Sequence, residues 1–443
     1  QQEFAPSIGD FSSLLLHGKA VNESLKTAFK HRVLLDVSPE GVSFDELLSE
    51  QSEYLGDILN FVLSEIDNDK LVTNIILDLG SFAVFLPDFT VADYTFQSRQ
   101  LLKLTQRVMS HFDHLLGCDI SLIMPDFISE NDDDRVLNES RGHVFAPVWG
   151  SIKSIVHEQL SFNKMVAYSI DTDADIECLR QVCNYKGPDF EFILRDERVL
   201  CPRLTAVSDI ESNSMVPSDN TQASSRAYVI TGGCGALGLA LTAHLVANGA
   251  NTIVLVNRRA KADLSSNTAS LIQQWEQHGC KIHVESVDVT QPLAVAELFE
   301  RLPNILSNDV HLQGIYHLAG APADTELFSQ THIDNWDAVW QPKVMGAWWL
   351  HTYSQSLQPK EFVLFSSVAS LLGYVGQAAY SSANFYLDWL AAHRQQYGLP
   401  ATAINWGPWQ GDGMAASALV NKAMAQVGIH GLIASEALSA MTS

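Results

Sequence analysis

Short apolar runs alternate with helical patterns along the second half of the chain. Apolar runs bounded by turn signals are typical of strands that are covered on both faces of a parallel sheet. They predict strands at residues 227–230, 251–256, 282–287, 314–320 and 362–367, and the patterns around them predict helices at residues 239–248, from Tyr380 onward and at residues 435–441.

The first half shows a similar alternation with weaker signals. Strands that alternate with helices in both halves predict an α/β fold made of two Rossmann-like doubly wound halves. In the first half we expect strands at residues 32–36, 75–79, 119–124, 166–170 and 190–194, helices at 45–66, at 95–116 and after 144–149, an entry segment at 1–30 and a solvated acidic loop at 132–134.

Residues 208–225 are small and polar, which is typical of a linker between domains. The sequence therefore predicts a first domain at residues 1–207, a linker at 208–225 and a second domain at 226–443. In the first domain Gly80 stands alone after its strand, and no strand end carries a glycine-rich turn. We expect no cofactor site in that domain.

Composition narrows the class of protein. Hydrophobic residues make up 47% and charged residues 18% of the 443 positions, which is typical of a globular protein. We find no apolar run of the ~20 residues that a membrane helix needs and no secretory leader. The six cysteines form no CxxC pair, so we expect a cytoplasmic protein without a metal site or a disulfide framework.

The net charge of −24 is concentrated in the first half of the chain. Residues 1–224 hold 36 acidic and 17 basic residues, a net of −19, whereas residues 225–443 hold 15 and 10, a net of −5. A chain this acidic is not expected to bind nucleic acid.

Four glycines lie within seven residues directly after the strand at 227–230, and a helix follows them. Strand, glycine turn and helix in this order are typical of a dinucleotide pyrophosphate site, because the backbone N–H groups face the phosphates. The residues assigned to this contact are Thr231, Gly232, Gly233, Cys234, Gly235, Ala236 and Leu237.

Further strand ends predict the remaining cofactor contacts. Asn257, Arg258 and Arg259 end the second strand, where arginine suits the 2′-phosphate of NADPH better than the ribose hydroxyl of NADH. The alternative interpretation is a solvated basic pair. Asp288 and Val289 end the third strand beside the expected adenine, and Ala319 and Gly320 end the fourth beside the ribose and nicotinamide.

Four residues predict the chemistry. Ser367 ends the fifth strand, Tyr380 and Asn384 share one face of the next helix, and Lys343 lies upstream. Reduction of a carbonyl group needs a proton donor and a second donor that holds the oxygen, which Tyr380 and Ser367 supply. Lys343 favours the phenolate of Tyr380, and Asn384 orients the lysine or bridges it to water.

These motifs resemble the ketoreductase domains of modular polyketide synthases, which belong to the extended short-chain dehydrogenase/reductase superfamily. In simple members a lysine lies four residues after the tyrosine, whereas here Asn384 has that place and Lys343 lies upstream. The resemblance covers residue 30 to the C-terminus and is carried by residues 231–238, 257–259, 317–320, 342–344, 365–367, 380–384, 405–409, 149–158 and 199–204.

The resemblance implies NADPH-dependent reduction of a β-ketoacyl thioester carried on an acyl carrier protein, within a synthase of neighbouring domains. It implies that the first half is a truncated Rossmann fold without a cofactor, that Pro408 and Trp409 contact the cofactor, and that residues 411–428, with Met414, form a lid.

The stereochemical positions depart from the family pattern. Residues 322–324 keep only Asp324 of the Leu-Asp-Asp motif of B-type members, and Leu372 stands where A-type members carry tryptophan. Gln377 matches the non-A pattern, although Val375 and Ala379 replace B-type Pro and Asn. We therefore expect B-type stereochemistry.

Two alternatives remain open. The chain could be a catalytically silent scaffold that holds neighbouring domains or a carrier protein, or a stand-alone short-chain reductase of free ketones. All four catalytic positions are filled, which argues against the scaffold, and the companion half of the chain argues against the stand-alone enzyme.

Overall fold

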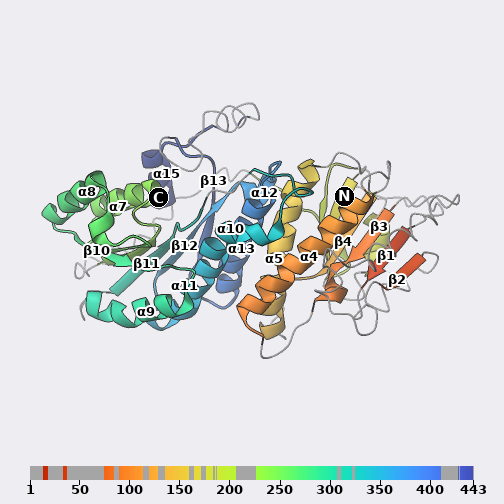
Figure 1. The fold of residues 1–443 in the computed structure, drawn as a ribbon, viewed down its shortest axis with the longest axis horizontal. Coiled ribbons are helices and arrows are strands. Elements are labelled where there is room, and N and C mark those ends of the chain that lie inside the picture. The colour runs from red at the N-terminus through yellow and green to blue at the C-terminus, as the bar shows by residue number, and fades with distance from the viewer. Residues whose placement is uncertain are drawn as a thin grey trace. The chain divides into compact units, whose positions relative to one another are not determined.

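A computed structural model of the chain divides into two compact units (Figure 1). The first unit contains the described residues up to Thr205 together with Thr325–Asn335 and Gly373–Ala378, and the second contains the rest. The structure describes residues 13–17, 33–36, 74–83, 89–112, 119–127, 135–158, 164–170, 176–182, 185, 187–205, 226–306, 311–321, 325–410, 428 and 430–442.

The second unit contains a parallel sheet with the strand order β10-β9-β8-β11-β12-β13. Its strand order reverses direction between β8 and β11, as in doubly wound folds whose ligands bind at that point. Its strands are β8 (Arg226–Thr231), β9 (Thr252–Asn257), β10 (Lys281–Ser286), β11 (His311–His317), β12 (Glu361–Ser367) and β13 (Thr402–Trp406).

Helices cover both faces of this sheet, with α7 and α8 on one face and α9 and α11 on the other (Figure 1). The helices are α7 (Ala236–Ala247), α8 (Ser266–Gln277), α9 (Pro292–Leu306), α10 (Asp337–Trp340), α11 (Gly346–Ser354), α12 (Ala369–Leu372), α13 (Ala378–Gln396) and α15 (Ala434–Thr442). Four short helical turns are η4 (Lys261–Asp263), η5 (Ile333–Trp336), η6 (Gln341–Met345) and η7 (Gln355–Leu357), of which η6 is a π-helix and η5 crosses from the first unit into the second.

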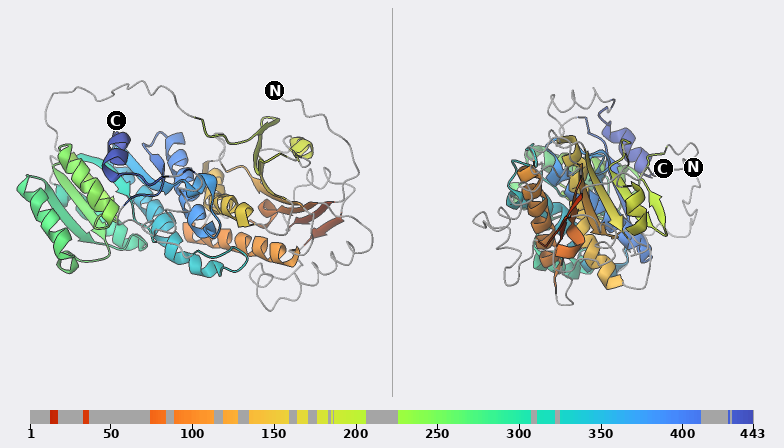
Figure 2. Two further views of the ribbon diagram at one scale, coloured as in Figure 1. Left: turned by 90° about the horizontal axis from the view of Figure 1, so that it is seen from above. Right: turned by 90° about the vertical axis from the view of Figure 1, so that its right-hand side faces the viewer.

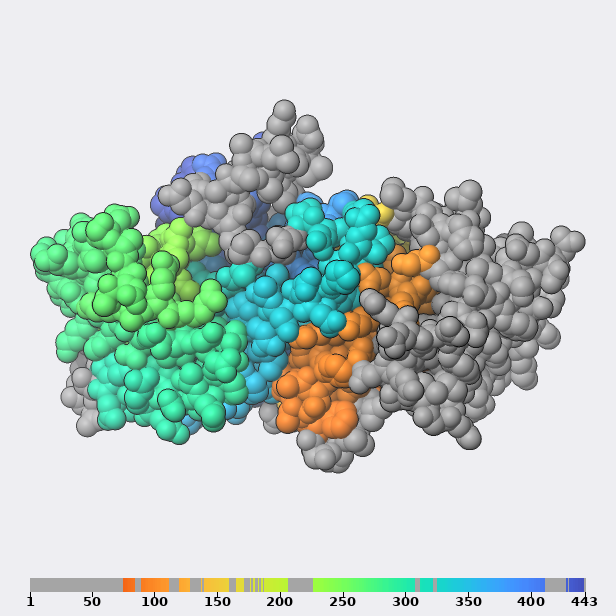
Figure 3. Space-filling view, viewed as in Figure 1, coloured from red at the N-terminus to blue at the C-terminus, as the bar shows by residue number. Residues whose placement is uncertain are grey.

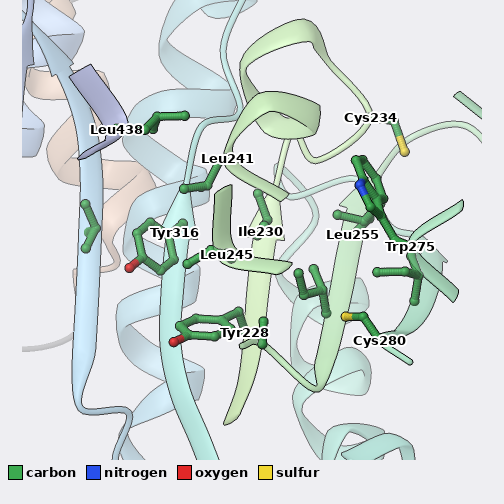
Figure 4. Close-up of a cluster of buried hydrophobic side chains, with 14 of the residues drawn as sticks. Tyr228, Ile230, Cys234, Leu241, Leu245, Leu255, Trp275, Cys280, Tyr316 and Leu438 are labelled. Atoms are coloured by element: carbon green, nitrogen blue, oxygen red, sulfur yellow. The ribbon is translucent and has the colours of Figure 1, made fainter. Parts of the chain in front are cut away.

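The core beside the glycine turn lies between α7, α8, α15 and one face of the sheet. Leu241 and Leu245 of α7 point toward Ile230 of β8, and Leu438 of α15 lies beside them (Figure 4). Buried strands of this kind hold the loops at their carboxyl ends in fixed positions, which is what a site needs.

The first unit contains a second sheet (Figure 2). Its strand order is β2-β1-β3-β4-β5-β6-β7, and all pairs are parallel except β6–β7. Its strands are β1 (Ser13–His17), β2 (Val33–Asp36), β3 (Asn74–Asp78), β4 (Asp119–Pro125), β5 (Lys164–Ile170), β6 (Glu191–Arg195) and β7 (Arg198–Leu200). Its helices are η1 (Leu79–Phe82), α4 (Val91–Phe112), α5 (Arg135–Glu158) and α6 (Ile176–Val182).

The predicted α/β fold class is confirmed, and each predicted strand overlaps an observed one. The strand expected at 314–320 lies at His311–His317 instead, and residues 318–320 follow it. The expectation of an entry segment at residues 1–30 is wrong at Ser13–His17, which pairs with β2 and β3 on its two sides. A run of three leucines is too short to separate strand from helix by its period, so pairing decides. The helix expected at 45–66, the acidic loop at 132–134 and the linker at 208–225 lie outside the described residues.

Candidate active site

The glycine turn after β8 leads into the uncapped first turn of α7, while the N–H groups of Gly232, Gly233 and Gly235 are bonded within the protein. Gly232 has φ +68°, a left-handed conformation that favours glycine, and a Cβ on Gly238 would lie 2.5 Å from the Gly232 oxygen. Gly235 is the N-cap of α7 without a side-chain cap, and it is exposed, as is Ala236. The first turn of α7 therefore presents the uncapped donors that an anionic group binds.

The end of β9 adds a buried donor without a partner. Asn257 Oδ1 accepts a hydrogen bond from the Arg259 backbone N–H (3.1 Å), whereas among the described residues Asn257 Nδ2 is buried and has no hydrogen-bond partner. Arg258 and Arg259 are exposed, and the charge of Arg259 reaches Cys234 in the glycine turn, where it opposes the burial that raises the thiol pKa. This arrangement fits a phosphorylated dinucleotide.

The other predicted cofactor residues differ in accessibility. Ala319 is half-buried and Gly320 exposed, and a Cβ on Gly320 would lie 3.1 Å from Lys343 Cε. Asp288 Oδ1 accepts from the Thr290 N–H (3.0 Å), and Val289 is buried.

Pro408 and Trp409 are both buried, and the Trp409 ring packs in the core, 4.7 Å between ring centroids from Trp406. Their assignment to the cofactor stays a prediction.

Ser367, Tyr380 and Asn384 come from two neighbouring elements. Ser367 is the last residue of β12, and its Oγ accepts a hydrogen bond from the Ala369 N–H (3.2 Å) at the start of α12. Tyr380 lies in the first turn of α13, and Asn384 one turn later donates from Nδ2 to the Tyr380 carbonyl oxygen (2.8 Å). Among the described residues the buried Asn384 Oδ1 has no partner.

Lys343 reaches the same place from the π-helix η6. Its side chain is buried, and its Nζ donates to the Phe365 carbonyl oxygen of β12 (3.0 Å) and lies 5.7 Å from the centroid of the Tyr380 ring. π-Helical turns interrupt regular helices and often occur at functional sites. The structure thus brings the lysine to the tyrosine although many residues separate them in the chain.

Burial sets the protonation of these groups. It lowers the pKa of the Lys343 ammonium to about 8, and the Asp388 carboxylate opposes this shift. Burial also raises the pKa of the Tyr380 phenol, while hydrogen bonds with Ser367 and Asn384 act in the other direction. Tyr380 therefore carries its proton at neutral pH, and the pKa of Lys343 lies close to that range.

His317 joins the glycine turn to the lysine, a role that the sequence did not reveal. Its Nδ1 lies 2.7 Å from Thr231 Oγ1 and its Nε2 lies 3.3 Å from the Lys343 carbonyl oxygen. Burial lowers the His317 pKa to about 3, so the ring is neutral. Because the carbonyl only accepts, Nε2 carries the proton and Nδ1 accepts from the Thr231 hydroxyl.

Asp388 is a second residue that sequence analysis missed. Ser370 Oγ donates to its Oδ2 (2.5 Å), and Asn405 Nδ2 donates to both of its oxygens (3.0 and 2.9 Å). The Ser370 Oγ also lies 2.8 Å from the Ser367 carbonyl oxygen, which competes with Asp388 for its single hydroxyl proton, so this network contacts the backbone at Ser367. Its position two turns after Tyr380, on the face shared with Asn384, is the signal that could have found it.

The predicted substrate residues are only partly described. Asp324 and Met414, with the predicted lid at 411–428, lie outside the described residues except for Gly428. Leu372 is 39% exposed at the end of α12, and Gln377 Nε2 donates to Thr325 Oγ1 (3.1 Å) within the first unit. Their roles stay predictions.

Searches of the described residues for metal and membrane features found neither. No group of three or more His, Cys, Asp or Glu side chains there could hold a metal ion. No helix in the same part of the chain is long and apolar enough to cross a membrane.

Residues 226–411 match the family model described as the KR domain. Over 224 residues the chain is 38% identical to 6-methylsalicylic acid synthase of Penicillium patulum, and over 207 residues it is 37% identical to mycoketide-CoA synthase of Mycobacterium tuberculosis. These matches cover 48% and 46% of this chain but 12% and 5% of the relatives, so the chain spans a small part of their length.

Two solved structures share the fold over nearly the whole chain. One is titled as A-type ketoreductases from a modular polyketide synthase, with a TM-score of 0.76, 21% identity and coverage of 98% of this chain and 86% of that one. The other is titled as an A1-type ketoreductase, with a TM-score of 0.77, 22% identity and coverage of 100% and 88%. At these identities the likeness shows the fold alone.

Proposed function

Since residues 226–411 belong to the KR domain family, we propose that this chain is a ketoreductase that uses NADPH to reduce a β-ketoacyl thioester to the β-hydroxyacyl thioester. One observation carries the proposal. Lys343, Ser367, Tyr380 and Asn384 meet at the carboxyl ends of the strands of one sheet, and Lys343 Nζ lies 5.7 Å from the Tyr380 ring.

NADPH, when bound, supplies the hydride. The uncapped first turn of α7 and the glycine turn suit its pyrophosphate, and the unpaired Asn257 Nδ2 with Arg258 and Arg259 suits its 2′-phosphorylated ribose. Gly320 is exposed and has no side chain that would contact the aliphatic part of Lys343. This leaves space beside the lysine for the nicotinamide ring.

The protein's own residues manage the carbonyl oxygen. Ser367 donates a hydrogen bond to it and Tyr380 transfers a proton to it as its negative charge develops. The Lys343 ammonium lowers the cost of the resulting phenolate, and the unpaired Asn384 Oδ1 can hold the ammonium or a water that returns the proton.

The partners and the setting are part of the same proposal. We assign the substrate to the phosphopantetheine arm of an acyl carrier protein, beside neighbouring domains of a polyketide synthase, in the cytoplasm and with B-type stereochemistry. Support comes from the synthases that the chain resembles over part of their length. The domain limits at 1–207 and 226–443 stay proposals, and residues 325–335 and 373–378 of the second range belong to the first compact unit.

The test is turnover by the purified chain. Incubated with NADPH and a racemic 2-methyl-3-ketoacyl thioester mimic, the protein should consume NADPH and give mainly one hydroxyl configuration. A preference for free ketones would instead identify a stand-alone reductase. NADPH binding without turnover of any thioester would identify a scaffold and refute the proposed activity.

A further inference from the structure

The last turns of α5 hold two segments that follow much later in the chain, and all three belong to the first unit. Glu158 Oε1 accepts a hydrogen bond from the Gly376 N–H (2.8 Å), and Glu158 Oε2 accepts one from the Phe328 N–H. One turn earlier, Ser154 Oγ accepts from the Tyr374 N–H (3.1 Å). A single helix face therefore receives three backbone donors from segments 325–335 and 373–378.

Close packing shows that these segments have little freedom. Gly373 and Gly376 have φ values of +65° and +72°. A Cβ on Gly373 would lie 1.9 Å from the Lys153 carbonyl oxygen, and a Cβ on Gly376 would lie 2.6 Å from Thr325 Cγ2. The backbone thus lies directly against α5, and the two segments lie directly against each other.

Segment 325–335 is also held from α4. Gln106 Nε2 donates to the Thr331 carbonyl oxygen (2.9 Å), and Lys103 pairs with Asp334 (2.9 Å). Figure 3 shows the turquoise surface of this part of the chain beside the orange surface of α4. Segment 325–335 is therefore also fixed independently of α5, whereas segment 373–378 forms hydrogen bonds with the side chains of Ser154, Glu158 and Thr325.

Segment 373–378 leads directly into α13, the helix that contains Tyr380. It carries Gln377, and Tyr380 follows its last residue by two positions in α13. An anchor on the Gly376 N–H therefore acts four residues before the proton donor. Misplacement of a catalytic group by about 1 Å can cost about a hundredfold in rate.

We propose that Glu158 is a positioning residue of the reductase, whose carboxylate joins segments 325–335 and 373–378 and thereby holds Gln377 and the start of α13, the helix that contains Tyr380. The inference rests on the proposed function. Carboxylates bind N–H donors more strongly than neutral acceptors do, and Glu158 is half-buried, which suits a lasting anchor. Burial raises the Glu158 pKa, while the two N–H donors act the other way and favour the ionised form.

Glu158→Gln tests the anchor with little change of shape. The amide keeps one oxygen acceptor and turns an NH₂ group toward the other backbone N–H, so one of the two bonds is lost. We expect kcat to fall by about tenfold, the KM for NADPH to stay unchanged and the minor hydroxyl isomer to increase. Hydrogen exchange at the Phe328 and Gly376 amides should quicken. Glu300→Gln, at an exposed position of α9, is the matched control.

The outcomes separate the two proposals. A variant whose two amides exchange faster, but whose kcat and isomer ratio stay at the wild-type values, overturns the positioning role. Unchanged exchange overturns the anchor itself. Absence of turnover in the wild type refutes the reductase instead, and amide exchange still reports the anchor. If Glu158→Gln does not fold, Ser154→Ala replaces it, with a two- to threefold smaller kcat as the rough expectation and no change as the contrary result.

Discussion

β3 and β11 hold the same place in their two sheets, since each is the strand to which the chain returns on the other side of the first strand. Both end on a buried titratable residue, Asp78 in the first unit and His317 in the second. The chain differs in the residues that follow these two strand ends. After Asp78 the chain enters η1, whose Ser81 N–H donates to the capping Asp78 carboxylate (3.4 Å). After His317, in contrast, Gly320 is exposed beside Lys343.

This difference shows that the sheet determines where a site can form, whereas the residues after its strands determine whether one forms. A neutral His317 ties the β8 and η6 backbones together and adds no charge to the place where an anionic cofactor would bind. A carboxylate at the equivalent point, as in Asp78, would repel pyrophosphate. The residues that follow these strands therefore differ in chemistry, although both sheets share the reversal of strand order beside their first strand.

The largest effect is expected from Tyr380→Phe, which removes the proposed proton donor of the second unit. We expect the reduction rate to fall by about a hundredfold or more, as for loss of a general acid. NADPH affinity, measured by fluorescence titration, should stay near the wild-type value. A variant that keeps most of its activity would show that the proton comes from another group.

A smaller effect is expected from Arg258→Asp, which gives the end of β9 an acidic residue like Asp36, the last residue of β2 in the first unit. The KM for NADPH should rise by about tenfold or more, since the 2′-phosphate loses a charge-assisted contact and meets a repulsive one. The KM for NADH should change far less. Equal changes for both cofactors would refute a 2′-phosphate contact.

Asp388→Asn tests how the charge of the Asp388 carboxylate affects the pKa of Lys343. Lys343 has a pKa of about 8, so the rate should fall as the pH rises through that value and the ammonium is lost. Removing the Asp388 charge lowers the Lys343 pKa further and should move this decline to lower pH by about half a unit to one unit. Ser370→Ala is the control, because it removes a hydrogen bond to Asp388 but no charge. A shift in both variants would remove Asp388 from the electrostatic role.

The smallest effect on activity is expected from Asp78→Asn in the first unit. Burial raises the Asp78 pKa to about 6 from 3.8, so the folded state binds this proton more tightly than the unfolded state. Stability is therefore lost as the pH rises between these values, and the neutral amide should avoid up to ~3 kcal/mol of that loss.

Thermal unfolding checks this prediction. Asp78→Asn should melt above the wild type at pH 7, and the two should converge near pH 4, with turnover unchanged. His317 has the opposite sign, because its pKa is depressed to about 3 and its stabilisation is lost as the pH falls below the ordinary histidine range. A lower melting temperature of Asp78→Asn at pH 7 would contradict the desolvation argument.

Most strands could be predicted, and candidate site residues could be proposed, because both depend on local patterns. The apolar run before Gly232 and the spacing of Tyr380 and Asn384 both lie within a few residues. β1 was missed because three leucines carry no period of their own. Proline would also end most helices, yet Pro147 lies inside α5. Tertiary packing overrides local preference in such cases.

By itself the sequence determined the two alternating α/β halves, the glycine turn and the residue types at the strand ends, because period, glycine and side-chain chemistry are properties of short segments. Only the tertiary structure decided that Lys343 lies in a π-helix and that burial keeps His317 neutral. It also decided that the Asp388 carboxylate acts on the Lys343 pKa and that Glu158 binds the segment before Tyr380. These features depend on burial and on contacts between distant residues, and neither is written in any one stretch of the chain.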